Sequence, residues 1–309
     1  MRISRVVAYS QAKHGLRMGP EESLQHQLDR QWCNNRSPGG AYQGHMLPGV
    51  LFVMWSVHWL QGSMRHFFAC KRSNMPYQSL PHYGLPGVPP WPLEPLVKIA
   101  MALLGATLEV TWHDDGFQNL VCRLGTARVG HFDGDHINNW QHVQMYACFL
   151  VSGVIDLIGY YGLLPAGTEK AMLSLAFAGE TILMGLHEKE EPLDRFLHQS
   201  LASAMLACCL ACALEAAWPA SYVITCARTA GVMLQGCLFI IIAQIMFQPH
   251  VAWTLMPDDT APLQVAKVVV IQTMVTIMGA YAALHIVVQA VAIQSRSGKG
   301  VHTGLVLAR

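Results

Sequence analysis

The chain of 309 residues is poor in charged side chains: Asp, Glu, Lys and Arg make up 13% of it, whereas a soluble domain typically has about 25%. Hydrophobic residues make up 52%, and the charges gather between long uncharged runs. This composition excludes an ordinary soluble domain and predicts an all-α, polytopic membrane protein whose partner is the lipid bilayer. The formal net charge of +1 gives no support to nucleic-acid binding.

The chain also lacks the marks of a disulfide framework and of a secretory signal. Most of its nine cysteines lie in apolar runs. Cys208, Cys209 and Cys212 have zinc-like spacing without a polar neighbour, so we interpret them as small helix-packing side chains. No apolar segment follows the first arginines, which argues against a signal peptide. We interpret residues 1–43 as a polar tail that is disordered.

Seven apolar runs have about the 20 residues that a membrane-spanning helix needs. They predict seven transmembrane helices in one bundle over residues 44–293, with a short cytosolic tail over 294–309. The predicted spans are Met46–Gly62, Leu93–Trp112, Trp140–Leu163, Glu169–Leu186, Leu193–Trp218, Ser221–Phe247 and Pro262–Ile293.

Local signals mark several helix starts. Asn139 and Thr168 are expected N-caps because their side-chain oxygens can accept from the free N–H groups of the first turn. Pro48 and Pro192 suit first turns, where a missing N–H costs nothing. Lys and Arg favour the cytosolic side, and they are more frequent in the loop after the first helix and near the C-terminus. We therefore predict a cytosolic C-terminus and a lumenal or extracellular N-terminus.

Polar side chains gather at one end of the predicted helices. Because successive helices run antiparallel, the end of each helix meets the start of the next. Glu109 and His113 lie four residues apart and share a helix face, as do Asp194 and His198. The predicted cluster contains His45, Glu109, His113, His142, Glu180, His187, Asp194 and His198.

This cluster has more than one reading. Histidine with carboxylates suits zinc, copper or iron, with His142, His187 and His198 as the metal ligands, and a pair of imidazoles can hold a haem. The same groups can form a proton or cation path with Glu180 and Asp156. In the structural reading, histidines near helix ends sit at headgroup depth and only bond neighbouring carbonyls.

Two further carboxylates lie within apolar runs, farther from this cluster. Asp156 is 14 residues after His142, near the same helix face and about 20 Å deeper. A carboxylate at that depth needs a partner inside the bundle. Glu215 lies near a helix end, and we expect it to reach the membrane interface.

Several of these motifs resemble the transmembrane protein 45 family. They are Gly44-His45-x-Leu47-Pro48-Gly49, Asn139-Trp140-Gln141-His142 followed by Ser152-Gly153, and Pro192-Leu193-Asp194 with His198, together with Glu109, Glu180 and Gln235. The resemblance covers about residues 42–292, while the long segment before Gly44 departs from the family pattern. It implies a seven-span fold, an endomembrane or plasma-membrane location, a domain of unknown function and no established reaction.

Three functional hypotheses follow. The first is a membrane protein with a metal or proton-active site, including a metal-dependent hydrolase in which Glu180 or Asp194 activates water. The second is a transporter for a cation or small solute with Glu180 and Asp156 along its path. The third is a non-catalytic scaffold in trafficking, in which polar groups only hold helices together.

Overall fold

The structure is a computed structural model that describes residues 42–85, 87, 91–111, 117, 119–122, 129–133, 136–187, 189, 191–248, 251–253 and 260–306, with side chains of the last helix described to Val291. Within these residues, 80% are helical and no strand is found. The prediction of an all-α protein is confirmed.

Seven α-helices occupy the described part of the chain, as the apolar runs predicted. In chain order they are α3 (Tyr42–Arg72), α4 (Leu93–Thr111), α5 (Ile137–Tyr160), α6 (Thr168–Gly185), α7 (Pro192–Ala217), α8 (Tyr222–Phe247) and α9 (Ala261–Val306), with a short 3-10 turn at Val251–Trp253. Most ends lie within a few residues of the prediction. Helix α3 is longer at both ends, and α9 continues into the segment 294–309 that we assigned to a tail.

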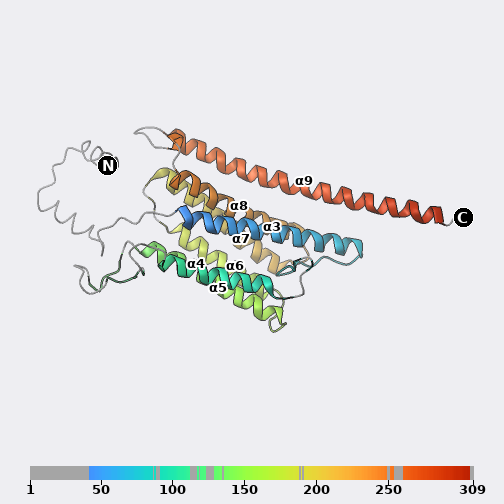
Figure 1. Ribbon diagram of the computed structural model, residues 1–309, viewed down its shortest axis with the longest axis horizontal. Coiled ribbons are helices and arrows are strands. Elements are labelled where there is room, and N and C mark those ends of the chain that lie inside the picture. Colours follow the sequence, from blue (N-terminus) through green and yellow to red (C-terminus); the bar gives the residue numbers. More distant parts are fainter. Residues whose placement is uncertain are drawn as a thin grey trace, which may run out of the picture.

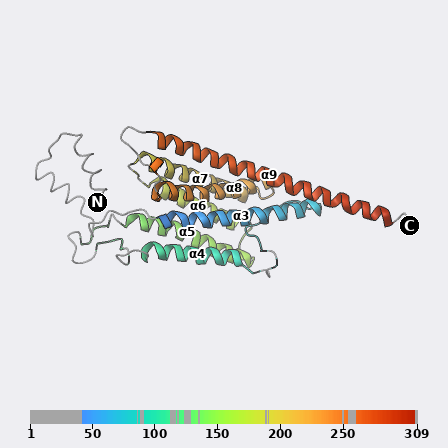
Figure 2. The same cartoon turned by 45° about the horizontal axis from the view of Figure 1, so that its top comes forward.

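Helices that are adjacent in sequence pack against each other from α4 through α8, and the first helix, α3, packs against α8. The first six helices run roughly parallel to one long axis in both views (Figures 1 and 2). Helix α9 lies beside α7 and α8, and its C-terminal part extends beyond them (Figure 1). This alternation brings the first turn of α3, α5 and α7 to the same end as the last turn of α4 and α6.

The contact of α3 with α8 depends on two glycines. A Cβ atom on Gly236 would lie 2.9 Å from the backbone oxygen of Gly49, closer than carbon atoms tolerate. Small residues at a helix crossing let the backbones approach, which is how helices pack in a membrane.

Four helices are long and apolar enough to cross a membrane: α5, α7, α8 and α9 as far as Val291. The sequence predicted seven spans in one bundle. Length and composition support four of these spans and, with them, a membrane protein. Helices α3, α4 and α6 fall short of these limits. In α4 and α6 several charged residues lie inside the fold, among them Lys98, Lys170 and Glu180, with 3%, 6% and 3% of their surface exposed.

Two expected N-caps are wrong. Helix α5 starts earlier, at Ile137, and the side chain of Asn139 donates to the backbone oxygen of Glu109 on α4, at 3.1 Å. Thr168 is the first residue of α6 and caps nothing, because Gly167 takes the N-cap position with a φ of 90°. That left-handed conformation strains most residues other than glycine.

The two prolines differ. Pro48 lies inside α3, which begins six residues earlier at Tyr42, so its expected first-turn position is wrong. Pro192 does open α7, as predicted, and Glu191 caps this helix by accepting from the backbone N–H groups of Leu193 and Asp194 at 3.0 and 2.7 Å.

Candidate functional site

The predicted cluster is largely assembled at one end of the helices. The described members come from α3, α4, α5, α6 and α7 and from the connection between α6 and α7: His45, Glu109, His142, Glu180, His187, Asp194 and His198. We call these seven residues the polar cluster. His113 lies outside the described residues.

Four imidazole rings of the polar cluster form a row. The ring centroids of His142 and His187 are 6.2 Å apart, and those of His187 and His198 are 5.7 Å apart. His45 follows at 5.7 Å from His198. Rings from α5, the α6–α7 connection, α7 and α3 thus lie next to one another.

Three of these rings are oriented in the same way. His142 Nδ1 lies 3.2 Å from Glu109 Oε2, and His187 Nδ1 lies 3.0 Å from Gln141 Oε1. His198 Nδ1 lies 2.7 Å from Asp194 Oδ1, and its hydrogen bond is with the backbone oxygen of Asp194, at 2.9 Å. Carbonyl and amide oxygens accept hydrogen bonds, so Nδ1 of His187 and Nδ1 of His198 carry the protons that they donate. When such a ring is neutral, its Nε2 atom is left as a proton acceptor.

His187 is held in the neutral form. Its burial between the helices, together with the positive charge of Lys189, lowers its pKa to about 3. Lys189 itself lies 3.7 Å from Asp194 Oδ2. At neutral pH the centre of the row is therefore an uncharged imidazole.

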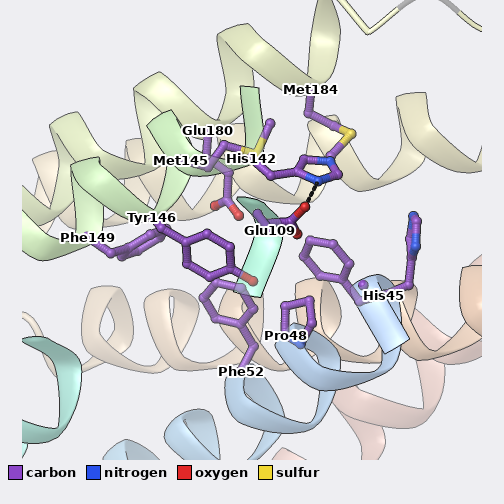
Figure 3. Close-up of a pocket in the computed structure, with 12 residues that line it drawn as sticks. His45, Pro48, Phe52, Glu109, His142, Met145, Tyr146, Phe149, Glu180 and Met184 are labelled. Carbon is purple, nitrogen blue, oxygen red and sulfur yellow. Dashed lines mark ion pairs between the residues drawn. The ribbon is translucent and has the colours of Figure 1, made fainter. Parts of the chain in front are cut away.

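The polar cluster borders a cavity of about 50 Å³. The carboxyl groups of Glu109 and Glu180 point into it, and Figure 3 shows the ion pair of Glu109 with His142 at its rim. Its other walls are mainly apolar: Pro48, Phe52, Met145, Tyr146, Phe149, Met184 and Phe239, with His45 and Gly44. A volume of this size has room for a few water molecules and none for a haem.

Glu180 is the most deeply placed acid of the cavity. Its side chain lies in the last two turns of α6 with 3% of its surface exposed. Gln235 of α8, which is fully buried, donates from Nε2 to Glu180 Oε2 at 2.8 Å. The partner of this carboxyl group is thus a neutral amide rather than a cation.

Phenylalanine rings form the inner wall of the cavity. Phe52 of α3 lies 5.8 Å from Phe149 of α5 and 6.0 Å from Phe239 of α8, measured between ring centroids. Phe177 of α6, one turn from Glu180, lies 5.3 Å from Phe149. We call these four rings the phenylalanine layer. On α5, Phe149 separates His142 from Ser152 and from Asp156 beyond it.

Asp156 has the buried partner that its depth required. Lys98 Nζ of α4 lies 2.5 Å from Asp156 Oδ2 and 3.0 Å from Ser152 Oγ. Glu215 does not reach the interface, contrary to expectation: it is fully buried, and Arg228 donates to it from Nε at 2.5 Å. The Arg228 guanidinium also lies over the Trp59 ring, 4.0 Å from its centroid.

A third acid, which is partly buried, lies in the same region. Glu94 accepts from the indole of Trp59 at 2.5 Å and lies 3.2 Å from His58 Nε2. We call Glu94, Lys98, Asp156, Glu215 and Arg228 the ion-pair layer. Sequence reasoning missed Lys98 and Arg228, although a lone cation inside an apolar run is a signal for a buried acid elsewhere.

Metal ligation has no geometric support in the described residues, where no group of three or more His, Cys, Asp and Glu side chains could hold a metal ion. His142, His187 and His198 lie close together, and their role as ligands of zinc, copper or iron stays a prediction. Cys208 and Cys212 are buried free thiols, as packing residues would be. Cys122, by contrast, forms a disulfide.

Helical content, four apolar helices and charged groups inside the fold define an all-α membrane protein. Residues 166–260 match the model of a family of unknown function, DUF716. The matched stretch contains α6, α7 and α8 and therefore Glu180, His187, His198, Arg228 and Gln235. The description of this family carries no activity.

Proposed function

We propose that the chain is a seven-span membrane protein that translocates protons, and that the polar cluster is the site where protons enter the bundle. The observation that carries this proposal is Glu180, a buried acid with a neutral partner, on a mainly apolar cavity that a row of imidazoles adjoins. Intramembrane acids of this kind are costly and mark proton relays.

The burial of charged side chains in α4 and α6 supports seven spans. Lys98 of α4 and Lys170 and Glu180 of α6 lower the hydropathy of their helices, yet all three side chains are buried and do not face lipid. Helix α4 has 19 residues and α6 has 18, which at 1.5 Å per residue is close to the roughly 30 Å of a bilayer core.

The disulfide at Cys122 supports the predicted orientation. Cys122 lies between α4 and α5, at the polar-cluster end of the helices. Disulfides persist in oxidising compartments, so this end faces the lumen or the cell exterior, and protons enter from that side.

The imidazole row supplies the acceptors for such a route. With Nδ1 fixed by an oxygen on His142, His187 and His198, the free Nε2 atoms can take a proton and pass it on as the rings exchange tautomers. The cavity between His142 and Glu180 has room for a few waters that would extend this route. Its size favours protons over a larger solute.

The phenylalanine layer closes the route in this conformation. Beyond it, Ser152, Asp156 and Lys98 are the next polar groups along α4 and α5. A proton on Glu180 therefore crosses only when the rings part, which makes translocation depend on a movement of the helices rather than on an open pore.

Proton flux into liposomes tests the proposal. Purified protein is reconstituted with an internal pH dye, and a potassium gradient with valinomycin sets the driving potential. We expect acidification above that of protein-free liposomes, loss of this flux in Glu180→Gln, and no change in the presence of a metal chelator. Glu169→Gln, the same change at the other end of α6, is the matched control and keeps the flux.

Absence of flux from correctly folded wild-type protein would contradict the proposal. The scaffold hypothesis would then account better for the polar cluster, because most of its members contact a group on another helix or on the α6–α7 connection. Flux that a chelator abolishes would instead favour the metal site.

A further inference from the structure

We infer that Glu180 is an uncharged carboxylic acid in this conformation, and that its O–H group donates to Oε1 of Gln235. The inference starts from an incomplete hydrogen-bond arrangement. Gln235 Nε2 donates to Glu180 at 2.8 Å, but the buried Oε1 atom of the same amide has no hydrogen-bond partner. Gln235 as a whole has no exposed surface.

A proton on Glu180 completes this arrangement. A glutamine side chain has two N–H donors and one oxygen acceptor, whereas an ionised carboxylate only accepts. Facing a carboxylate, the amide of Gln235 can use its donors and not its oxygen. Facing a carboxylic acid, it donates from Nε2 and accepts at Oε1, so both groups are satisfied by two complementary hydrogen bonds. A buried polar atom left without a partner is uncommon in folded proteins.

The surroundings of Glu180 do not stabilise a negative charge. Helix α8 faces it with Gln235, and on α7 the buried thiol of Cys208 interacts with it electrostatically. Across the cavity the charged or titratable groups are His45 of α3, Glu109 of α4 and His142 and Tyr146 of α5, with the Cys148 thiol also close on α5. No lysine or arginine is among these described neighbours, and Glu109 already contacts His142.

The buried acids of the ion-pair layer show what an ionised carboxylate requires here. Asp156 has Lys98 at 2.5 Å, and Glu215 has Arg228 at 2.5 Å. Glu180 has an amide and a cavity wall of apolar side chains. Burial of an unpaired charge is far more costly than burial of a neutral acid, so Glu180 keeps its proton.

In the function proposed above, Glu180 is the group that takes up the proton. Its protonation state is argued independently of that function, and only the route by which the proton leaves rests on it. Release breaks the O–H bond of Glu180, moves the proton to a cavity water or an imidazole nitrogen, and leaves a carboxylate. The hydrogen bond to Gln235 Oε1 is lost in the same step, so the contact of α6 with α8 loosens as the proton leaves. Figure 3 shows Glu180 facing the cavity through which this exchange runs.

Infrared spectroscopy of the full chain in lipid at pH 7 tests the protonation state. We expect a carbonyl band of a protonated carboxylic acid, which ionised surface carboxylates do not show. The band is lost in Glu180→Gln, whose second amide supplies the same two hydrogen bonds and preserves the fold. It is retained in Glu169→Gln. In D₂O it shifts to lower frequency as the proton exchanges through the cavity.

Gln235→Leu tests the partner. Without the amide oxygen the acid is no longer hydrogen-bonded, and its carbonyl band shifts to higher frequency. A wild type without the band, a band that persists in Glu180→Gln, or a frequency unchanged in Gln235→Leu would overturn the inference. A band that behaves as expected in protein that shows no proton flux would uphold the inference and overturn the proposed translocation.

Discussion

The two polar regions of the molecule use buried charge in opposite ways. In the ion-pair layer Lys98 faces Asp156 and Arg228 faces Glu215, in each case at 2.5 Å. In the polar cluster Glu109 faces an imidazole and Glu180 faces an amide, and both line a cavity. Fixed pairs of full charges hold helices in register, whereas groups with neutral or titratable partners can change their protonation.

The largest effect is expected from breaking one pair of the ion-pair layer. Arg228→Met leaves the fully buried Glu215 without its cation, and removing one partner of a buried pair costs about 3–5 kcal/mol. We expect a large fall in the melting temperature of the detergent-solubilised protein, or a loss of folded protein.

The double variant Arg228→Met/Glu215→Leu separates charge from packing. With neither charge present the unpaired carboxylate is gone, so much of the stability returns. If the single and double variants are equally unstable, the pair is not what holds α7 against α8 there.

A smaller effect is expected at the polar cluster from Gln235→Leu. Glu180 then loses the hydrogen bond that it accepts from Gln235 Nε2, and a buried polar group without a partner costs about 1–3 kcal/mol. Gln244→Leu, the same change on the same helix, removes an exposed contact with Tyr42 and should change the unfolding temperature little. Equal shifts in both variants would argue against a special role for Gln235.

The smallest effect is a pH dependence at His187. Burial lowers the pKa of this residue in the folded protein to about 3 from 6.5, so below pH 6.5 the unfolded chain binds a proton that the folded protein does not. Stability that is complete above pH 6.5 therefore declines as the pH falls toward 3. Unfolding of wild type between pH 7 and 5 should show this decline more steeply than His187→Gln, which cannot titrate. Parallel curves would contradict it.

The sequence was sufficient to predict the positions of the helices and the gathering of the polar cluster at one end of them. Apolar runs of sufficient length set the helix positions, and antiparallel order alone brings His142, His187 and His198 to one end. The start of α3 could not be predicted in this way, because Tyr42 precedes the apolar run and Pro48 suggested a later beginning.

The sequence could not predict which side chains pair with one another inside the fold, for a physical reason. Whether Lys98 meets Asp156, or Gln235 meets Glu180, depends on how each helix is rotated about its axis, and 58 and 55 residues separate these pairs. The exclusion of α4 and α6 from the four apolar spans has a related cause. Several of their charged side chains face the interior, and such charges count against a helix when only its length and composition are considered.

The most direct test of the central claim measures proton flux in the same liposome assay for one variant of the polar cluster and one variant of the ion-pair layer. The account predicts that Glu180→Gln abolishes flux while its melting temperature stays close to that of wild type. The folded Arg228→Met/Glu215→Leu variant, changed at the other end, keeps flux. Flux that survives in Glu180→Gln at the wild-type rate would contradict the assignment of the polar cluster as the site of proton entry.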